Sequence, residues 1–147
     1  MNESHPAYDR PSELQIRDAQ TLVARFAALW RRPDPETFRA LMHADTRNLV
    51  PPMTEPADRE GVVRHFNEVV RQLPGLSVEV QRWALAGETV MIEWRATATI
   101  ATQAVAWTGV DVMRLRGDRM FEAQVYWDTR GTAERIASAV HAATAGN

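Results

Sequence analysis

The stretch Thr89–Ile100, TVMIEWRATATI, decides the fold class. Val90, Ile92, Trp94 and the even-numbered residues after them are apolar, whereas the odd-numbered positions are mostly charged or carry hydroxyl groups. A period of two indicates a β-strand, and one apolar face beside one polar face is typical of an antiparallel sheet. The stretch therefore predicts a strand with one face toward a core and the other toward water.

Three neighbouring stretches continue this pattern and predict an antiparallel run of strands. They cover residues 77–84, Gln103–Arg116 and Arg119–Trp127. Gly117-Asp118 lies between the last two stretches and is a hairpin signal. Residues 105–115 are apolar on both faces, which indicates a central strand whose outer face is covered. We therefore predict a homodimer that packs through the outer face of the sheet.

The N-terminal half shows helical spacing instead. Ser12 fits the N-cap of a helix that ends before Pro33 and Pro35, since proline lacks the backbone donor that a helix needs. Further helices are predicted at 36–43, 59–73 and 132–143, with a short strand at 47–50. This order predicts an α+β fold. We expect a cone-shaped barrel, in which a strongly curved mixed or antiparallel sheet wraps over about three N-terminal helices, plus a C-terminal helix. One domain spans 12–143, between a disordered tail at 1–11 and a short tail at 144–147.

Composition excludes several classes of function. The 147 residues contain no cysteine, so disulfides and thiolate metal sites are excluded. The net charge is −2 and charges of both signs are interspersed along the chain, so the sequence has no basic patch for nucleic acid. No stretch reaches the ~20 apolar residues of a membrane span. No set of His, Asp or Glu has the spacing of metal ligands. We predict a cytoplasmic protein with no metal and no cofactor, and with neither nucleic acid nor membrane as partner.

Three stretches resemble a known family. They are MHADTRNLVPP at 42–52, LSVEVQRWALAGETVMIEWRATATI at 76–100 and WTGVDVMRLRGDRMFEAQVYWD at 107–128. The first resembles part of the nuclear transport factor 2-like superfamily, and the other two resemble the hairpins of its SnoaL-like branch. Relatives there include polyketide cyclases, ketosteroid isomerase and limonene epoxide hydrolase. The resemblance implies a cone with a ligand pocket at its open end.

The positions that carry chemistry in these relatives are mostly apolar in this chain. By this resemblance, Val50 occupies the position at which ketosteroid isomerases have a carboxylate base. Phe26 occupies the position of their phenol donor. Trp94 and Ala96 match the polar pair of limonene epoxide hydrolase, and Val125 matches its other acid. The resemblance thus implies a hydrophobic pocket, and we predict that ketosteroid isomerase and epoxide hydrolase activities are absent.

Asp111 is the main candidate for chemistry. The resemblance matches it to the protonated acid of ketosteroid isomerases, and strand parity with Gly109 and Met113 points it into the cone. A carboxyl group in an apolar cavity has a raised pKa, so it can donate a proton to a ligand carbonyl. The alternative is a buried ion pair with one of Arg25, Arg64 or His65.

Two further residues are candidate catalytic groups. His65 flanks an apolar helix face and can serve as a base or proton shuttle, or can be half-buried without a role. Asn48 shares parity with Val50 and can orient a water or a carbonyl, or can bond only to backbone. The predicted ligand-binding wall, whose members can equally be simple core residues, consists of Phe26, Trp30, Val50, Met53, Phe66, Trp94, Ala96, Met113, Val125 and Trp127.

Two functions fit these residues. One is a cofactor-independent enzyme of cyclase or isomerase type, with Asp111 as general acid toward a small hydrophobic carbonyl compound. The other is a non-catalytic domain that binds a hydrophobic ligand or serves as a dimeric accessory domain.

Overall fold

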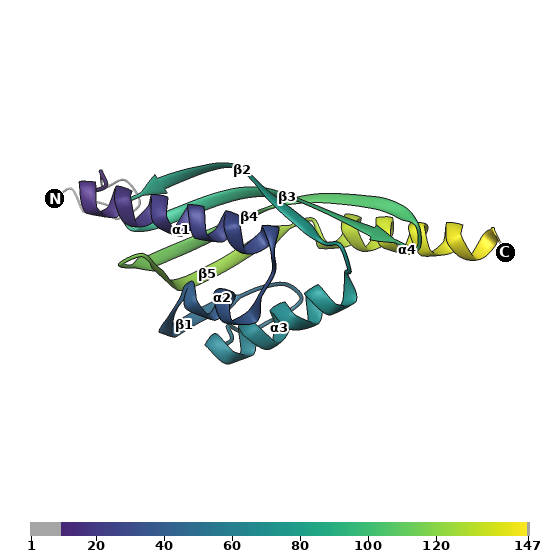
Figure 1. Ribbon diagram of the computed structural model, residues 1–147, viewed down its shortest axis with the longest axis horizontal. Coiled ribbons are helices and arrows are strands. Elements are labelled where there is room, and N and C mark those ends of the chain that lie inside the picture. Colours follow the sequence, from purple (N-terminus) through teal and green to yellow (C-terminus); the bar gives the residue numbers. More distant parts are fainter. Residues whose placement is uncertain (1–9, 147) are drawn as a thin grey trace.

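The computed structural model describes residues 10–146 and has an α+β fold (Figure 1). The chain runs through α1 (Glu13–Arg31), α2 (Pro35–Ala40), β1 (Met42–Leu49), α3 (Arg59–Gln72), β2 (Ser77–Ala86), β3 (Thr89–Ile100), β4 (Gln103–Arg116), β5 (Arg119–Trp127) and α4 (Thr129–Ala145). Most of the tail predicted at 1–11 lies outside the described residues. None of the described helices is both long and apolar enough to cross a membrane.

The strands form one five-stranded sheet in the order β1-β5-β4-β3-β2. Neighbours are antiparallel except β1, which pairs with β5 in parallel, so the predicted mixed α+β sheet is confirmed. The sheet stays open, because β1 and β2 are its two edges. In Figure 1 α1 runs along the strands, α2 and α3 lie together on one side, and α4 projects beyond the body.

The second helix predicted at 36–43 is shorter than its sequence pattern indicates. Residues Leu41 and Met42 are buried, but they leave the helix, and β1 begins at Met42 instead of at residue 47. The reason is tertiary: Met42 pairs with Met120 on β5, and the Met120 amide donates to the Leu41 carbonyl at 2.8 Å. His43, expected at a helix end, is therefore a strand residue.

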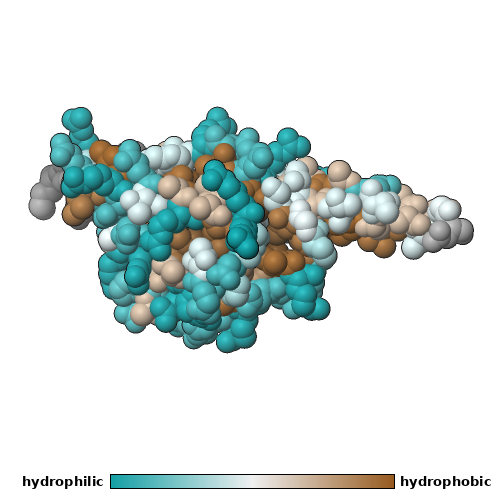
Figure 2. All heavy atoms as spheres, viewed as in Figure 1, coloured by the Kyte–Doolittle hydropathy of each residue, from teal (hydrophilic) through white to brown (hydrophobic). Residues whose placement is uncertain are grey.

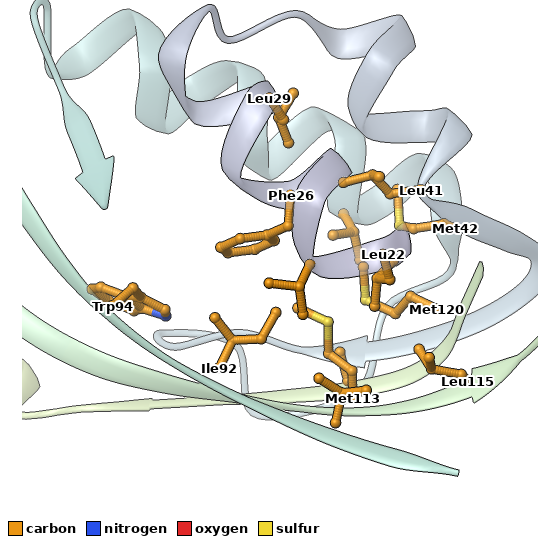
Figure 3. Packing of buried hydrophobic residues seen from close by; sticks show 14 of the residues in the cluster. Leu22, Phe26, Leu29, Leu41, Met42, Ile92, Trp94, Met113, Leu115 and Met120 are labelled. Carbon is orange, nitrogen blue, oxygen red and sulfur yellow. The ribbon is translucent and has the colours of Figure 1, made fainter. Parts of the chain in front are cut away.

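Helix α1 begins where its capping residues predict. Ser12 Oγ accepts from the Gln15 amide at 3.1 Å, and the Gln15 side chain accepts from the Ser12 amide at 2.8 Å. The helix then turns Leu22 and Phe26 toward the sheet, and Leu29 is buried in the same hydrophobic cluster (Figure 3). Burial of this apolar face against the strands is what holds the helix in place.

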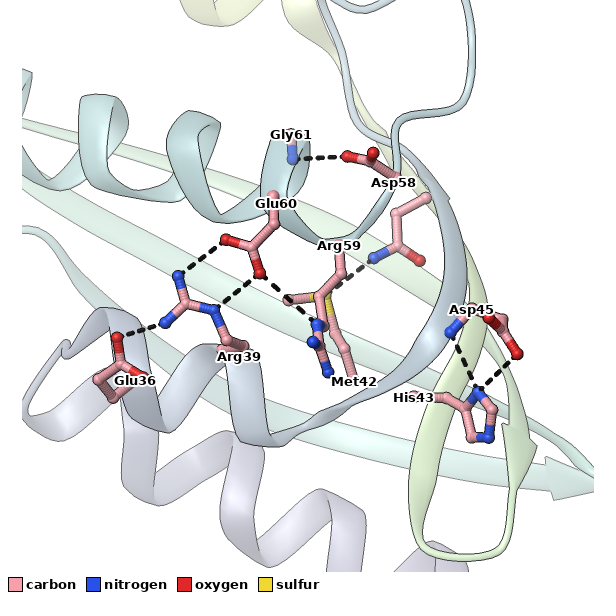
Figure 4. Close-up of polar contacts among 10 residues, drawn as sticks. Glu36, Arg39, Met42, His43, Asp45, Asp58, Arg59, Glu60 and Gly61 are labelled. Carbon is pink, nitrogen blue, oxygen red and sulfur yellow. Dashed lines mark hydrogen bonds and ion pairs between the residues drawn. The ribbon is translucent and has the colours of Figure 1, made fainter.

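An arginine joins α2 to α3. Arg39 donates to both carboxylate oxygens of Glu60 at 2.9 Å and also contacts Glu36 (Figure 4). Its hydrogen bonds hold the pKa of Glu60 below the usual value. Asp58 caps α3 by accepting from the Gly61 amide at 2.8 Å. These contacts fix α3, which supplies one wall of the site.

Candidate functional site

A cavity of about 470 Å³ lies between the sheet and the helices. That volume falls within the roughly 300–1,000 Å³ of small-molecule sites. Its mouth is flanked by the end of α3 and the start of α4, where the exposed lining residues Gln72, Thr129 and Ala133 lie. Figure 2 shows hydrophobic side chains at the base of the projecting α4, beside the hydrophilic body.

Aromatic rings form much of the cavity wall. Phe38 stacks on Phe66 with centroids 4.4 Å apart, and Trp30 tilts against Phe66 at 5.3 Å. Trp94 meets Trp127 edge to face at 6.2 Å. Such walls offer flat apolar surface for a flat apolar ligand.

Asp111 enters this cavity from β4, as strand parity predicts. Gly109, Asp111 and Met113 are buried on the same face of the strand, and the Asp111 side chain reaches the cavity. Trp94 Nε1 donates to Asp111 Oδ1 at 2.7 Å. Among the described residues, no group donates to the second oxygen, Oδ2. Burial raises the pKa of Asp111 to about 7, against the opposing effect of the Trp94 hydrogen bond.

Gly109 creates the room that Trp94 needs. The two residues are direct partners between β3 and β4, and the indole lies across the glycine. A Cβ at position 109 would lie 2.3 Å from Trp94 Cζ2 and 2.8 Å from the Tyr126 carbonyl oxygen. Only glycine therefore lets the indole lie where it can hold Asp111.

The alternative of a buried ion pair at Asp111 finds no support in the described residues. Arg25 instead donates to the Ala40 carbonyl at 2.9 Å and approaches Asp118 at 3.5 Å. No lysine or arginine of the described chain lines the cavity. Asp111 thus has a neutral hydrogen-bond donor beside it and no cation.

His65 lies on α3 and lines the same cavity. It is half-buried, and burial lowers its pKa below the usual value. The imidazole is therefore neutral near pH 7 and can accept a proton. From the sequence, His65 was expected either to act as a base or proton shuttle or to be half-buried without a role. The structure places His65 and Asp111 in the lining of one cavity.

Asn48 is fully buried on β1 and also borders the cavity. Its Oδ1 accepts from Thr46 Oγ1 at 3.1 Å, and its Nδ2 donates to Met42 Sδ at 3.3 Å. Both ends of the amide thus contact other side chains, rather than the backbone that the sequence alternative named. One amide hydrogen and one oxygen lone pair remain for a ligand.

The structure brings the predicted wall residues to the cavity, apart from Met53. At that place the wall is built by Val50, Pro51 and Pro52. A tight turn, in which the Met53 amide donates to the Val50 carbonyl at 2.9 Å, ends the wall before Met53. The prediction for Met53 is therefore wrong, because the proline pair takes its place.

Sequence reasoning missed several lining residues. Val62 and Val69 on α3, and Leu73 directly after it, share the helical period of Phe66, so that period could have found them. The α4 residues Thr132 and Ile136 have no signal of this kind, since nothing in the sequence shows that the last helix borders the cavity. The further members are Phe38, Gln72, Leu76, Val78, Trp107, Met120, Ala123, Thr129 and Ala133.

Among the described residues, no group of three or more His, Asp or Glu side chains could hold a metal ion. Besides the indole N–H groups of its tryptophans, the side chains that line the cavity offer one carboxyl, one imidazole, two amides and two hydroxyls, from Asp111, His65, Asn48, Gln72, Thr129 and Thr132. Such a set can donate and accept protons at an otherwise apolar ligand.

Comparison with solved structures finds the same fold in proteins of low sequence identity. A protein described as a SnoaL-like polyketide cyclase from Jannaschia sp. CCS1 has 16% identity and a TM-score of 0.76, covering 88% of this chain and 97% of that chain. One described as a polyketide cyclase from Bacillus cereus ATCC 10987 has 15% identity and a TM-score of 0.76, covering 93% and 95%. A nuclear transport factor 2-like protein from Anabaena variabilis ATCC 29413 has 15% identity and a TM-score of 0.69, covering 84% and 96%.

No curated protein matches the chain. The family model of the SnoaL-like domain matches residues 23–123, which is more than half of the chain. The resemblance read from the three sequence stretches is confirmed. The chain belongs to the SnoaL-like domain family.

Proposed function

We propose that this protein binds a small hydrophobic carbonyl compound and catalyses acid–base chemistry on it without a cofactor. The observation that carries the proposal is Asp111, a buried carboxyl group with a pKa of about 7 and no cation beside it. Trp94 occupies Oδ1, so Oδ2 is free to carry the proton toward a ligand. A neutral carboxylic acid in an apolar site donates strongly to a carbonyl oxygen.

The reaction is enolisation followed by isomerisation or ring closure. His65 takes a proton from the carbon next to the carbonyl while Asp111 gives its proton to the carbonyl oxygen, so a C–H bond breaks and an O–H bond forms. Return of a proton to a different carbon gives an isomer. Alternatively, the enol carbon attacks a second carbonyl of the same molecule. A C–C bond then forms, the enol proton returns to Asp111, and the new alkoxide takes the proton from His65.

Deuterium exchange into 2-tetralone tests this proposal. This bicyclic ketone has an acidic C–H next to its carbonyl, and exchange in D₂O is followed by NMR. We expect the wild-type protein to accelerate exchange over buffer, and Asp111→Asn and His65→Gln each to lower the rate about 100-fold or more. Asp118→Asn, which removes a partly exposed carboxylate on the turn after β4, is the matched control. If the wild-type protein exchanges deuterium into 2-tetralone no faster than buffer does, the proposed acid–base catalysis is refuted.

The second candidate is a non-catalytic binding domain. It is favoured by Val50, Ala96 and Val125, which line the cavity with apolar groups where related enzymes have polar ones. In that case 2-tetralone quenches tryptophan fluorescence without exchanging deuterium. In either case we expect no turnover of steroid isomerase or epoxide hydrolase substrates.

We also propose that a second copy covers the outer face of the sheet. Met91, Val110, Val112 and Tyr126 lie on the face opposite the cavity, on three adjacent strands. Pairs of opposite charge flank this apolar strip, among them Arg114 and Glu122 at 2.8 Å, so the face can complement itself.

Light scattering during gel filtration tests the dimer. We expect the mass of a dimer for the wild type and of a monomer for Val110→Lys/Val112→Lys, because two buried, unpaired ammonium groups oppose association. Ala24→Lys, on the exposed side of α1, is the control and should remain dimeric. A monomeric wild type would refute this assembly.

A further inference from the structure

The charges around the cavity restrict what can bind there. Of the described residues that line it, only Asp111 and His65 are ionisable. They face the cavity from β4 and α3, and the other polar lining groups are neutral. No lysine or arginine of the described chain faces the cavity. The site thus offers one potential negative charge and no permanent positive charge.

The absence of a lysine or arginine among the described lining residues disfavours anionic ligands. A carboxylate or phosphate moved into the cavity would lose its hydration and meet no cation that replaces it. Near Asp111 it would also meet a second acid, and two like charges raise the cost further. Fatty acids and phosphorylated compounds therefore fit poorly, although the apolar wall would accept their hydrocarbon parts.

A cationic ligand, in contrast, would find favourable partners in the cavity. The Asp111 carboxyl is buried and its one described hydrogen bond comes from a neutral indole, so its ionised form lacks a counter-ion. An ammonium group next to Oδ2 would supply that charge and a hydrogen bond. The indole rings of Trp30, Trp94, Trp107 and Trp127 also line the cavity. Aromatic faces attract cations, and most strongly when the cation is desolvated.

We propose that the cavity binds hydrophobic amines, with the ammonium group paired to Asp111 Oδ2 and the hydrocarbon part against the tryptophan wall. This inference rests on the part of the proposed function that makes Asp111 the polar contact of a bound small molecule. It does not depend on catalysis.

The two ligand classes need opposite forms of Asp111. A carbonyl compound needs the protonated acid, whereas an amine needs the carboxylate. Burial raises the pKa of Asp111 and lowers that of His65, the other ionisable group at the cavity. His65 is then neutral where Asp111 ionises, so it neither repels the ammonium group nor replaces it. Amine binding should strengthen as pH rises past 7, while carbonyl binding should weaken.

Three naphthalene probes test the proposal by tryptophan quenching: 2-acetylnaphthalene, 2-(aminomethyl)naphthalene and 2-naphthoate. They share one ring system and differ in charge. We expect the amine to bind the wild type at about pH 8 at least tenfold more tightly than Asp111→Asn, and at least tenfold more tightly than at pH 5.5. We expect the naphthoate to bind tenfold or more weakly than the amine at pH 8. The comparison of pH values uses only wild-type protein, so it holds even if the variant does not fold.

Equal amine affinity at both pH values, or naphthoate binding as tight as the amine, would overturn this inference. Ketone binding at pH 5.5 with no amine binding at pH 8 would overturn it alone and leave the proposed function standing. Amine binding without ketone binding would support this inference and would refute the proposed function, in which the ligand is a carbonyl compound. No binding of any probe would overturn both.

Discussion

Asp111→Asn is expected to gain stability over the wild type as pH rises, by about 4 kcal/mol between pH 4 and pH 8. Burial, opposed by the Trp94 hydrogen bond, raises the folded-state pKa from 3.8 to about 7. The unfolded chain therefore releases this proton at lower pH than the folded chain. Between these two pKa values the unfolded state binds fewer protons, so the wild type loses stability until about pH 7, where the loss is complete. Asparagine does not titrate and keeps an oxygen for Trp94.

Urea unfolding of both proteins at intervals from pH 4 to pH 8 measures this difference. Subtraction of the two profiles removes the titration of every other group that the substitution leaves unchanged. Asp118→Asn is the control for the loss of a carboxyl group nearer the surface. A difference that stays flat over this range would mean that Asp111 is ionised in the folded protein at ordinary pH.

Gly109→Ala is expected to destabilise the protein by about 1–3 kcal/mol, the usual cost of overpacking. The new methyl group would lie 2.3 Å from Trp94 Cζ2 and 2.8 Å from the Tyr126 carbonyl oxygen, so the indole must move. Movement of the indole breaks its 2.7 Å hydrogen bond to Asp111. Denaturant unfolding at pH 5, where Asp111 is protonated, isolates the packing cost from the charge.

Trp94→Phe is the companion variant, because it removes the indole N–H and retains an aromatic ring. The Trp94 hydrogen bond lowers the pKa of Asp111, so the pKa should rise in this variant and in Gly109→Ala. An unfolding free energy of Gly109→Ala within about 0.5 kcal/mol of the wild type, with an unchanged Asp111 titration, would contradict this role of the glycine.

The strands were the most predictable part of this fold. In β3, β4 and β5 the alternation of residues gave the observed boundaries, because one buried face imposes a period of two. The same parity located Asp111 correctly, between outward-facing Val110 and Val112. Where a local pattern and a long-range pairing disagreed, at Leu41 and Met42, the pairing with β5 prevailed.

The site was less predictable, because its members meet only through tertiary structure. Sequence pattern gave no sign that Trp94, one strand away, is the hydrogen-bond partner of Asp111. It also gave no sign that Gly109 makes this contact possible, or that α4 contributes Thr132 and Ile136 to the cavity lining. These relations depend on the register between strands and on where the helices pack, and neither can be predicted from the sequence pattern alone.

The titration of the Asp111 side-chain carbon, followed by ¹³C NMR and assigned by its loss in Asp111→Asn, tests the account most directly. A buried acid beside a single indole donor should give a midpoint of about 7. A midpoint near the ordinary aspartate value of about 3.9 would contradict the neutral acid, and with it the carbonyl chemistry built on it.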